Sequence, residues 1–169
     1  MAVSENVHLD LDAFVATEYA KVVAAVGLIT GNRQGAEDAV QDAIVGFLAK
    51  PPAHPVINLA AWFTVVASNR IRDNYRSDAA RQRAVAKLGI PVEEMTDQSE
   101  LLDIDVRNAL LQLPIRQRQV CTLHYLMDQS VHTIAEGLGV SEGTVKTQLH
   151  RGRKALAARL SKGVNRGLA

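Results

Sequence analysis

Polar and basic side chains recur at helical spacing between residues 141 and 154, and they are the strongest chemical signal in this sequence. Hydroxyl, amide, carboxylate and guanidinium groups contact base edges and phosphates when a helix lies in the major groove of duplex DNA. The candidate duplex-contacting residues are Ser141, Glu142, Thr144, Lys146, Thr147, Gln148, Arg151, Arg153 and Lys154. Their pattern predicts a DNA-binding surface.

The elements around these residues predict a helix-turn-helix. The apolar residues of the helix expected at 141–160 fall on its other side and would dock it on its own domain; they are Val145, Leu149, Gly152, Leu156 and Leu160. A shorter helix is expected at 131–138, with Ser130 as its N-cap and Gly139 supplying the tight turn after it. The periodicity alone leaves one alternative open, an ordinary amphipathic surface helix whose charges are only solvated.

A second polar face is expected on a helix at 59–77. Its residues are Trp62, Asn69, Arg72, Asp73 and Arg76, which share nearly one line along the helix. Aromatic rings and guanidinium groups stack on unpaired bases, and amide or carboxylate groups meet their Watson–Crick edges, so this face suits single-stranded nucleic acid. In the alternative interpretation, Trp62 and Phe63 belong to the core, and Asp73 pairs with a neighbouring arginine on a solvated face.

A third surface is expected on a helix at 36–49, where Glu37, Asp38, Gln41 and Asp42 lie opposite the apolar stripe. Such an acidic face can dock a basic partner helix. A face that is merely solvated is the alternative.

Composition bounds the class of protein. The chain has 169 residues, 47% of them hydrophobic and 4% aromatic, which suits small helical modules. A single cysteine, Cys121, excludes an internal disulfide and is expected to be a small buried hydrophobe, and the five histidines lack metal-ligand spacing. The sequence has neither a membrane-length apolar run nor a signal-peptide pattern, so we expect a cytoplasmic protein with no metal, no cofactor and no membrane partner.

Charge is distributed unevenly along a chain whose net charge is only +1. Residues 103–169 carry ten basic and five acidic side chains, whereas residues 1–76 carry six and eight. The electrostatic bias of a duplex-binding module is therefore confined to the C-terminal part.

The order of predicted elements is all-α, with two small helical domains. Residues 8–77 form the first domain, with helices at 11–29, 36–49 and 59–77 and a proline-rich loop at 50–58. Residues 78–101 are expected to be a flexible linker. The second domain, 102–162, has helices at 102–113, 115–127, 131–138 and 141–160, with Pro114 at a helix start and residues 163–169 as a tail.

Taken in order, these segments resemble bacterial RNA polymerase sigma factors of the extracytoplasmic-function (ECF) class. The resemblance is carried by AEDAVQDAIVGFL, then AWFTVVASNRIRDNYR, then LLQLPIRQRQVCTLHYLMDQSVHTIAEGLGVSEGTVKTQLHRGRKAL. It covers about 11–76, matching that family's region 2, and 102–160, matching its region 4.

The resemblance implies roles for specific residues. Asp38, Gln41, Asp42 and Phe47 would dock on the coiled coil of the largest polymerase subunit, and the flap of the second-largest subunit would be a further contact. The helix from Trp62 to Arg76 would melt and read the −10 promoter element, with a flipped base held by the loop that ends at Asn58. The helix from Ser141 to Arg153 would read the −35 element. An anti-sigma factor is a possible further partner, and no catalytic site is implied because the polymerase does the chemistry.

Three positions depart from the family pattern. Ser68 stands where arginine is common, and Gln148 and Gly152 stand where arginine and alanine are frequent. Gln148 suits adenine rather than guanine. Gly152 is expected to weaken its helix by roughly 1 kcal/mol relative to alanine.

Two rival functions remain. The first is a helix-turn-helix transcription regulator without polymerase-directing activity, in which only the C-terminal module touches DNA. The second is a helical interaction protein that binds polymerase without initiating transcription.

Overall fold

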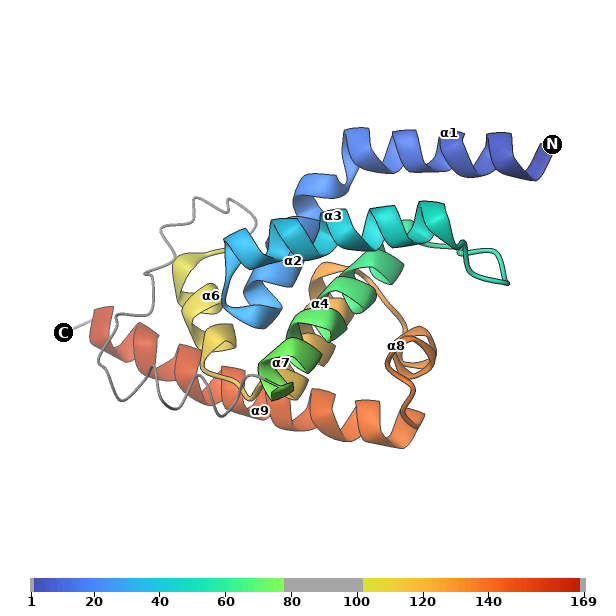
Figure 1. Ribbon diagram of the computed structural model, residues 1–169. Helices are drawn as coiled ribbons and strands as arrows, with labels where there is room; N and C mark the ends of the chain where they lie inside the picture. The colour runs from blue at the N-terminus through green and yellow to red at the C-terminus, as the bar shows by residue number, and fades with distance from the viewer. Residues whose placement is uncertain (1, 78–101, 168–169) are drawn as a thin grey trace.

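Helices are the regular elements of the residues that the computed structural model describes, 2–77 and 102–167 (Figure 1). The N-terminal half contains α1 (Ala2–Thr17), α2 (Tyr19–Thr30), α3 (Arg33–Ala49) and α4 (Leu59–Ser77). The C-terminal half contains α6 (Ile104–Leu111), α7 (Ile115–Cys121), the π-helix η1 (Thr122–Leu126), α8 (Val131–Leu138) and α9 (Glu142–Gly167). The predicted all-α class is confirmed, and the linker expected at 78–101 lies outside the described residues.

The turns between helices follow the sequence signals. Gly31 ends α2 in the left-handed conformation (φ 76°), which glycine adopts without steric cost. Asn32 then caps α3, and its side-chain oxygen accepts a hydrogen bond from the Gly35 amide at 2.9 Å. Helix α3 therefore begins three residues earlier than predicted.

The single helix expected at 11–29 is wrong, because the chain bends by 66° between Asp10–Thr17 and Tyr19–Thr30. Next to the bend, the Thr17 hydroxyl donates to the Ala13 carbonyl at 2.7 Å, a back-bond that commonly bends helices. The bend brings Phe14 into the core, with its ring centroid 4.8 Å from that of Phe63, while Val15 stays 51% exposed. Helical spacing alone does not reveal where such a stripe is broken.

The N-terminal core is built by α2, α3 and α4 around small and β-branched residues. Val22, Val26 and Val40 are fully buried, and Phe63 fills the space between them at 0% exposure. Burying a side chain of this size stabilises the fold by about 1.5–3 kcal/mol. This core fixes which sides of α3 and α4 face outwards.

The C-terminal core is built by α6, α7, η1, α8 and α9 around Leu110, Leu113, Leu123, Ile134 and Val145. The single helix predicted at 115–127 is not continuous, because the chain changes to a π-helix from Thr122 onward. Pro114 occupies the N-cap of α7 rather than its first helical position. Helix α9 extends to Gly167, so it runs past 160 into the segment predicted to be a tail.

The two halves pack against each other rather than standing apart. Leu28 of α2 belongs to the C-terminal core, and Met127 belongs to the N-terminal core. Arg118 of α7 donates to the carbonyl of Ile29 at 3.0 Å, and also to those of Leu111 and Leu113 at 2.9 Å. The partial burial of this guanidinium lowers the pKa of Arg118 from its ordinary value.

Gln119, the next residue of α7, extends the contact between the halves. Its side chain is 1% exposed, and its amide donates to Ser68 Oγ at 2.9 Å and to Asn69 Oδ1 at 3.0 Å, both on α4. Gln119 and Arg118 together therefore join the C-terminal half to both α2 and α4. We call these hydrogen bonds the domain interface.

Helix α9 lies close against α7 where Gly152 faces Cys121. A Cβ atom at Gly152 would overlap Cys121 Sγ, so the absence of a side chain allows the contact. Burial raises the pKa of the Cys121 thiol to about 11, while the nearby Arg153 charge acts in the opposite direction, so the thiol stays neutral. The predicted buried role of Cys121, at 1% exposure, is confirmed.

We expect Gly152→Ala to destabilise the protein by about 1–3 kcal/mol, because overpacking outweighs the roughly 1 kcal/mol gain in helix propensity. Gly46→Ala is the matched control, since nothing lies within 4 Å of a Cβ at Gly46 in α3. The control should stabilise by roughly 0.5–1 kcal/mol. Urea denaturation measures both changes, and Cys121→Ala should relieve the penalty at Gly152. Equal effects of the two alanines would contradict the role assigned to the close approach.

Candidate nucleic-acid and polymerase interfaces

The helix-turn-helix is formed by α8, the turn at Gly139 and α9. Ser130 caps α8 by accepting from the Thr133 amide at 3.1 Å, and Gly139 takes the left-handed conformation (φ 63°). Ser141 accepts from the Thr144 amide at 3.1 Å and so caps the start of α9. The predicted caps and turn are therefore confirmed.

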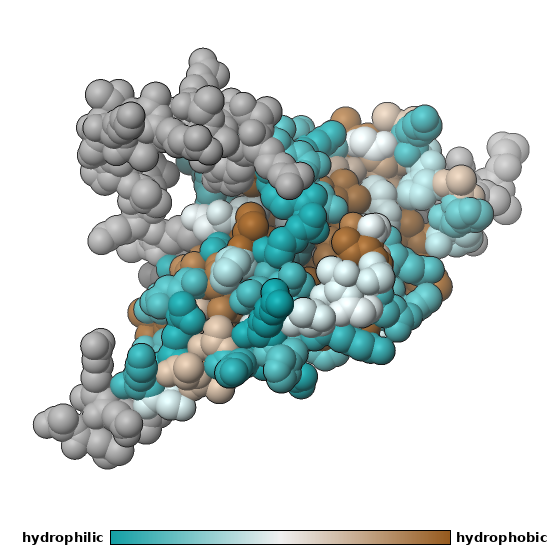
Figure 2. Space-filling model, turned by 90° about the horizontal axis from the view of Figure 1, so that it is seen from below, coloured by the Kyte–Doolittle hydropathy of each residue, from teal (hydrophilic) through white to brown (hydrophobic). Residues whose placement is uncertain are grey.

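The division of α9 into two sides is also present. Val145 and Leu149 are buried at 0% and 5% exposure and dock the helix on its domain. The other side, which we call the α9 outer face, contains all nine predicted duplex-contacting residues. Those exposed are Ser141, Glu142, Thr144, Lys146, Thr147, Arg151, Arg153 and Lys154, whereas Gln148 is half-buried. Figure 2, seen from the α9 side, shows mostly hydrophilic residues there with smaller hydrophobic areas.

Glu142, in the first turn of α9, faces positive groups from two helices. Its Oε1 lies 3.0 Å from His132 Nδ1 of α8, and its Oε2 lies 3.9 Å from Lys146 Nζ. His132 Nε2 lies 3.4 Å from Glu136 Oε1. The hydrogen bond to Glu142, with the charge of Glu136, raises the pKa of His132 above its ordinary value.

The polar face expected on α4 is only partly available. Trp62 is half-buried and makes edge-to-face contacts with Phe47 and Phe63, at centroid distances of 5.3 and 5.1 Å. Asn69 is half-buried and holds its side-chain oxygen toward Gln119. The alternative interpretation is therefore correct for Phe63, which is 0% exposed, and describes Trp62 in part.

The charged residues of α4 pair with one another or with α3. Arg72 Nη2 lies 3.3 Å from Asp73 Oδ1, and Asp73 is the more exposed of the two, at 64% against 17%. The Nε and Nη1 atoms of Arg72 are buried with no hydrogen-bond partner among the described residues. Arg70 pairs with Asp42 of α3 at 3.7 Å rather than with Asp73. Arg76 lies on α4, but its side chain is outside the described part.

Asn58, expected in the base-holding loop, caps α4. Its side-chain oxygen accepts from the Ala61 amide at 2.9 Å, so that acceptor already has a structural task. Ile57, immediately before it, is fully exposed. Asn58 itself is exposed, so the loop presents an apolar side chain beside the predicted polar one.

The outward side of α3, which we call the α3 acidic face, keeps three of the four predicted polymerase-contacting residues exposed: Asp38, Gln41 and Asp42. Phe47 is a correction, because it is 5% exposed and packs against Trp62 and Phe63 in the core. The exposed large apolar residues of α3 are instead Val45 and Leu48, which are 65% and 45% exposed. Leu48 was missed because it was assigned to the apolar stripe of this helix, and Val45, outside that stripe, was assigned to neither side.

The domain interface was also missed. Ser68 and Gln119 are buried at 0% and 1% exposure and hydrogen-bond to each other. The one signal in the sequence was Ser68 itself, a small hydroxyl residue where arginine is common in similar chains. Gln119 gave no signal, since a glutamine within a short polar helix is usually exposed.

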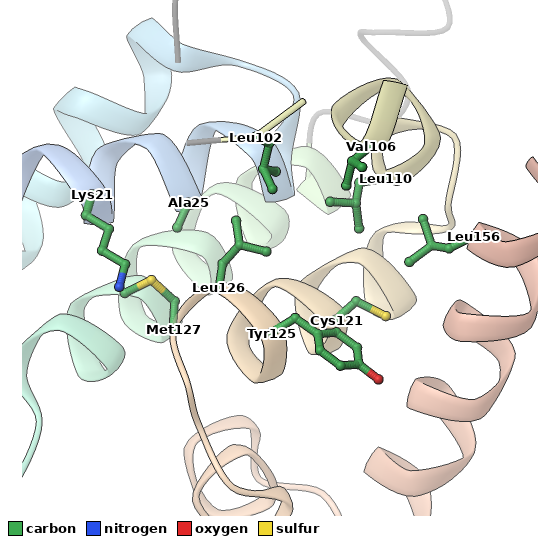
Figure 3. Close-up of a pocket in the computed structure, with 10 residues that line it drawn as sticks. All are labelled: Lys21, Ala25, Leu102, Val106, Leu110, Cys121, Tyr125, Leu126, Met127 and Leu156. Atoms are coloured by element: carbon green, nitrogen blue, oxygen red, sulfur yellow. The ribbon is translucent and has the colours of Figure 1, made fainter. Parts of the chain in front are cut away.

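A cavity of about 440 Å³ lies where α2 meets α6, α7, η1 and α9 (Figure 3). Among the described residues that line it, Lys21 is the charged one, and the others are apolar apart from Tyr125 and Cys121. The cavity therefore lacks the convergent acids and bases that a catalytic pocket needs.

Two further observations concern classes of site. Within the described ranges, no cluster of His, Cys, Asp and Glu has an arrangement that could hold a metal ion. In the same ranges no single helix is long and apolar enough to cross a membrane, although the bent pair Asp10–Thr17 and Tyr19–Thr30 meets that criterion jointly by length and composition.

Comparison with known proteins places both halves in one family. The family model "Sigma-70 region 2" matches residues 14–81, and "Sigma-70, region 4" matches 103–156. The ECF RNA polymerase sigma factor SigL of Mycobacterium tuberculosis is 34% identical over 166 residues, covering 88% of this chain and 89% of SigL. SigM of the same species is 31% identical over 148 residues, covering 82% and 72%.

A solved structure shows the same architecture. The sigma factor RpoE of Bartonella quintana, crystallised with the anti-sigma factor NepR, superposes with a TM-score of 0.72 at 26% identity, covering 90% of this chain and 97% of RpoE. A helix-turn-helix regulator without polymerase-directing activity is not favoured, because the similarity extends through the N-terminal half as well. The chain therefore belongs to the ECF class of RNA polymerase sigma factors, a family of promoter-directing transcription initiation factors.

Proposed function

We propose that this sigma factor brings core RNA polymerase to promoters through two DNA contacts, with the α9 outer face on the −35 duplex and the polar face of α4 on the unpaired −10 strand. The observation that carries the first contact is the exposed basic side of α9, opposite a buried apolar side and directly after a capped helix-turn. Short polar side chains and arginines on such a helix suit the major groove.

The second contact depends on capture of unpaired bases. Asp73 is exposed and can meet a separated strand directly, whereas the guanidinium nitrogens of Arg72 without partners among the described residues are buried and would reach a strand only after that side chain turns outward. Unstacking a base costs a few kcal/mol, which stacking and hydrogen bonds to the captured base offset. The side-chain oxygen of Asn69 already accepts from Gln119, so a base that binds this oxygen competes with the contact between α7 and α4.

The α3 acidic face supplies the polymerase contact. Asp38, Gln41 and Asp42 offer acidic and amide groups to a basic partner helix, and Val45 and Leu48 add exposed apolar area beside them. Charge complementarity with an apolar patch is the usual composition of a helix-docking surface. By family likeness, the partner is the coiled coil of the largest polymerase subunit, and region 4 meets the flap of the second-largest subunit.

Further assignments follow from the same family. The polymerase supplies the chemistry, so this chain needs no catalytic residue or cofactor of its own, and it acts in the cytoplasm. Because RpoE of Bartonella quintana was solved with the anti-sigma factor NepR, an anti-sigma factor is a candidate partner here too.

Arg151→Ala and Lys146→Ala should each weaken binding of the −35 duplex and reduce the slope of log affinity against log salt by about 1. Each variant removes one positive charge from the α9 outer face. Fluorescence anisotropy with core polymerase and a duplex recovered from a random-sequence library measures both quantities. Lys21→Ala, which removes an exposed lysine from α2, is the control; an equal loss there would show that only overall charge matters.

Asn69→Ala and Asp73→Ala should impair promoter opening while leaving the −35 contact intact. Permanganate footprinting reports opening through thymine reactivity, and footprinting of the upstream duplex reports the −35 contact. Asp12→Ala on α1 removes an exposed acid without touching α4 and is the control. Thymine reactivity that is unchanged in both α4 variants would refute the single-strand assignment.

Val45→Asp should weaken association with core polymerase at least about tenfold, which corresponds to roughly 1.4 kcal/mol of lost contact at a docking surface. Val15→Asp is the matched control, because Val15 is 51% exposed and lies on a different helix, α1. Competition for core polymerase against a labelled wild-type chain measures both. If the two variants compete equally, the α3 acidic face is not the docking surface.

A further inference from the structure

The contact between His132 and Glu142 crosses the helix-turn-helix at the point where α9 begins. His132 lies on α8 and Glu142 in the first turn of α9, and their side chains meet at 3.0 Å. Both are well exposed, at 66% and 49%, so their attraction adds little to the stability of the fold. The pair matters instead for the predicted DNA-facing surface. There, His132 holds the Glu142 carboxylate in place and, when protonated, offsets its negative charge.

The geometry favours a doubly protonated imidazole ring. Nδ1 faces Glu142 and Nε2 faces Glu136, at 3.0 and 3.4 Å. A neutral imidazole has one N–H, so one of the two carboxylates would then face a nitrogen lone pair. The charged ring donates from Nδ1 to Glu142 and holds its positive charge close to Glu136.

The charge balance of this cluster decides how the first turn of α9 meets a phosphate backbone. Glu142 has His132 on one oxygen and Lys146 on the other. The net charge of the cluster is the sum over His132, Glu136, Glu142 and Lys146. It is zero when His132 is protonated and −1 when His132 is neutral. A negative charge at the DNA-facing end of the helix repels the polyanion.

We propose that His132 is a positioning residue for duplex recognition, which holds and neutralises Glu142 at the start of α9 and so makes the DNA affinity of this sigma factor depend on pH. The inference rests on the proposed contact of the α9 outer face with the −35 duplex. It acts through Glu142 and does not require His132 to touch DNA.

The direction of the pH effect follows from linkage. The pKa of His132 is raised by Glu142 and Glu136, so the ring is charged below its raised pKa and becomes neutral as pH rises through it. Duplex affinity should therefore be highest at the acid end of the working range and fall as pH rises. By reciprocity, DNA binding should draw a proton onto the ring.

The test uses the full chain with core polymerase, a chelator, and an end-labelled duplex recovered from a random-sequence library. Wild-type affinity should fall about fivefold between pH 6 and pH 8.5, on the order of the effect of one charge at a protein–DNA surface. His132→Gln should bind with the weaker affinity at every pH. His132→Arg, whose charge is permanent, should bind with the tighter affinity at every pH.

Two controls isolate the route of the effect. In a background that carries both Glu136→Gln and Glu142→Gln, His132→Gln should cause no further loss, because neither of the two carboxylates that face the ring is left to neutralise. His150→Gln removes another exposed histidine, on α9 itself, and should keep the wild-type pH profile. Ring NMR of the free chain should show the pKa of His132 falling in Glu142→Gln.

The outcomes are distinguishable. A wild-type chain that holds no duplex at any pH overturns the proposed −35 contact itself. Duplex binding with the same pH profile in wild type and His132→Gln overturns only the role of His132. A further loss from His132→Gln in the background that lacks both carboxylates would mean that His132 contacts phosphate directly, which also overturns the inference.

Discussion

The contact of Gly152 with Cys121 is the constraint on which the DNA-facing half depends. It lets α9 lie directly against α7, so Val145 and Leu149 can bury their side chains and the opposite side must face outwards. Glycine inside a long helix has a cost in backbone entropy. At Gly152 this cost comes with a close approach to Cys121 that a larger residue would block. Glycine was expected to weaken the helix relative to alanine, and it is also the residue that allows the helix to lie in this position.

Helix α7 carries a second task on its other side. Arg118 and Gln119 bind backbone and side-chain oxygens of α2 and α4. Helix α7, only seven residues long, therefore connects α9 to the N-terminal core. Apolar contacts accompany the hydrogen bonds of the domain interface, since Leu28 and Val65 pack against the C-terminal core and Met127 belongs to the N-terminal core. Interfaces with this polar character resemble transient ones, which open without unfolding either side. A sigma factor whose two DNA-binding surfaces must reach different promoter elements needs an interface of this kind.

Sequence patterns predicted correctly those features that depend on interactions between residues close together in the chain. Ser130, Gly139 and Gly31 fixed caps and turns correctly, because each acts within a few residues of itself. The bend beside Glu18 and the π-helix after Cys121 were missed, since the periodicity of apolar residues does not encode where a helix bends or changes its hydrogen-bond pattern. Nor does it encode the contacts of Phe47 and Asn69. Their partners, Trp62 and Gln119, lie 15 and 50 residues away in the chain. The α9 outer face was predictable because its residues follow one another along a single segment. The apolar residues of that segment show which side is buried, and so which side faces outwards.

The two proposed DNA-binding surfaces differ in how exposed they are, and this difference bears on how a promoter is opened. The α9 outer face is already exposed, whereas on α4 the Asn69 oxygen is engaged by Gln119 and Trp62 is packed against Phe47. Capturing a base at Asn69 exchanges an internal hydrogen bond for an external one, and such an exchange yields little net free energy. Strand capture must then draw on contacts made elsewhere, by α9 on the duplex and by α3 on polymerase. Because one chain joins these contacts, each raises the effective concentration of the others. The free chain is thus expected to be a weak single-strand binder, and the assembled polymerase complex a strong one.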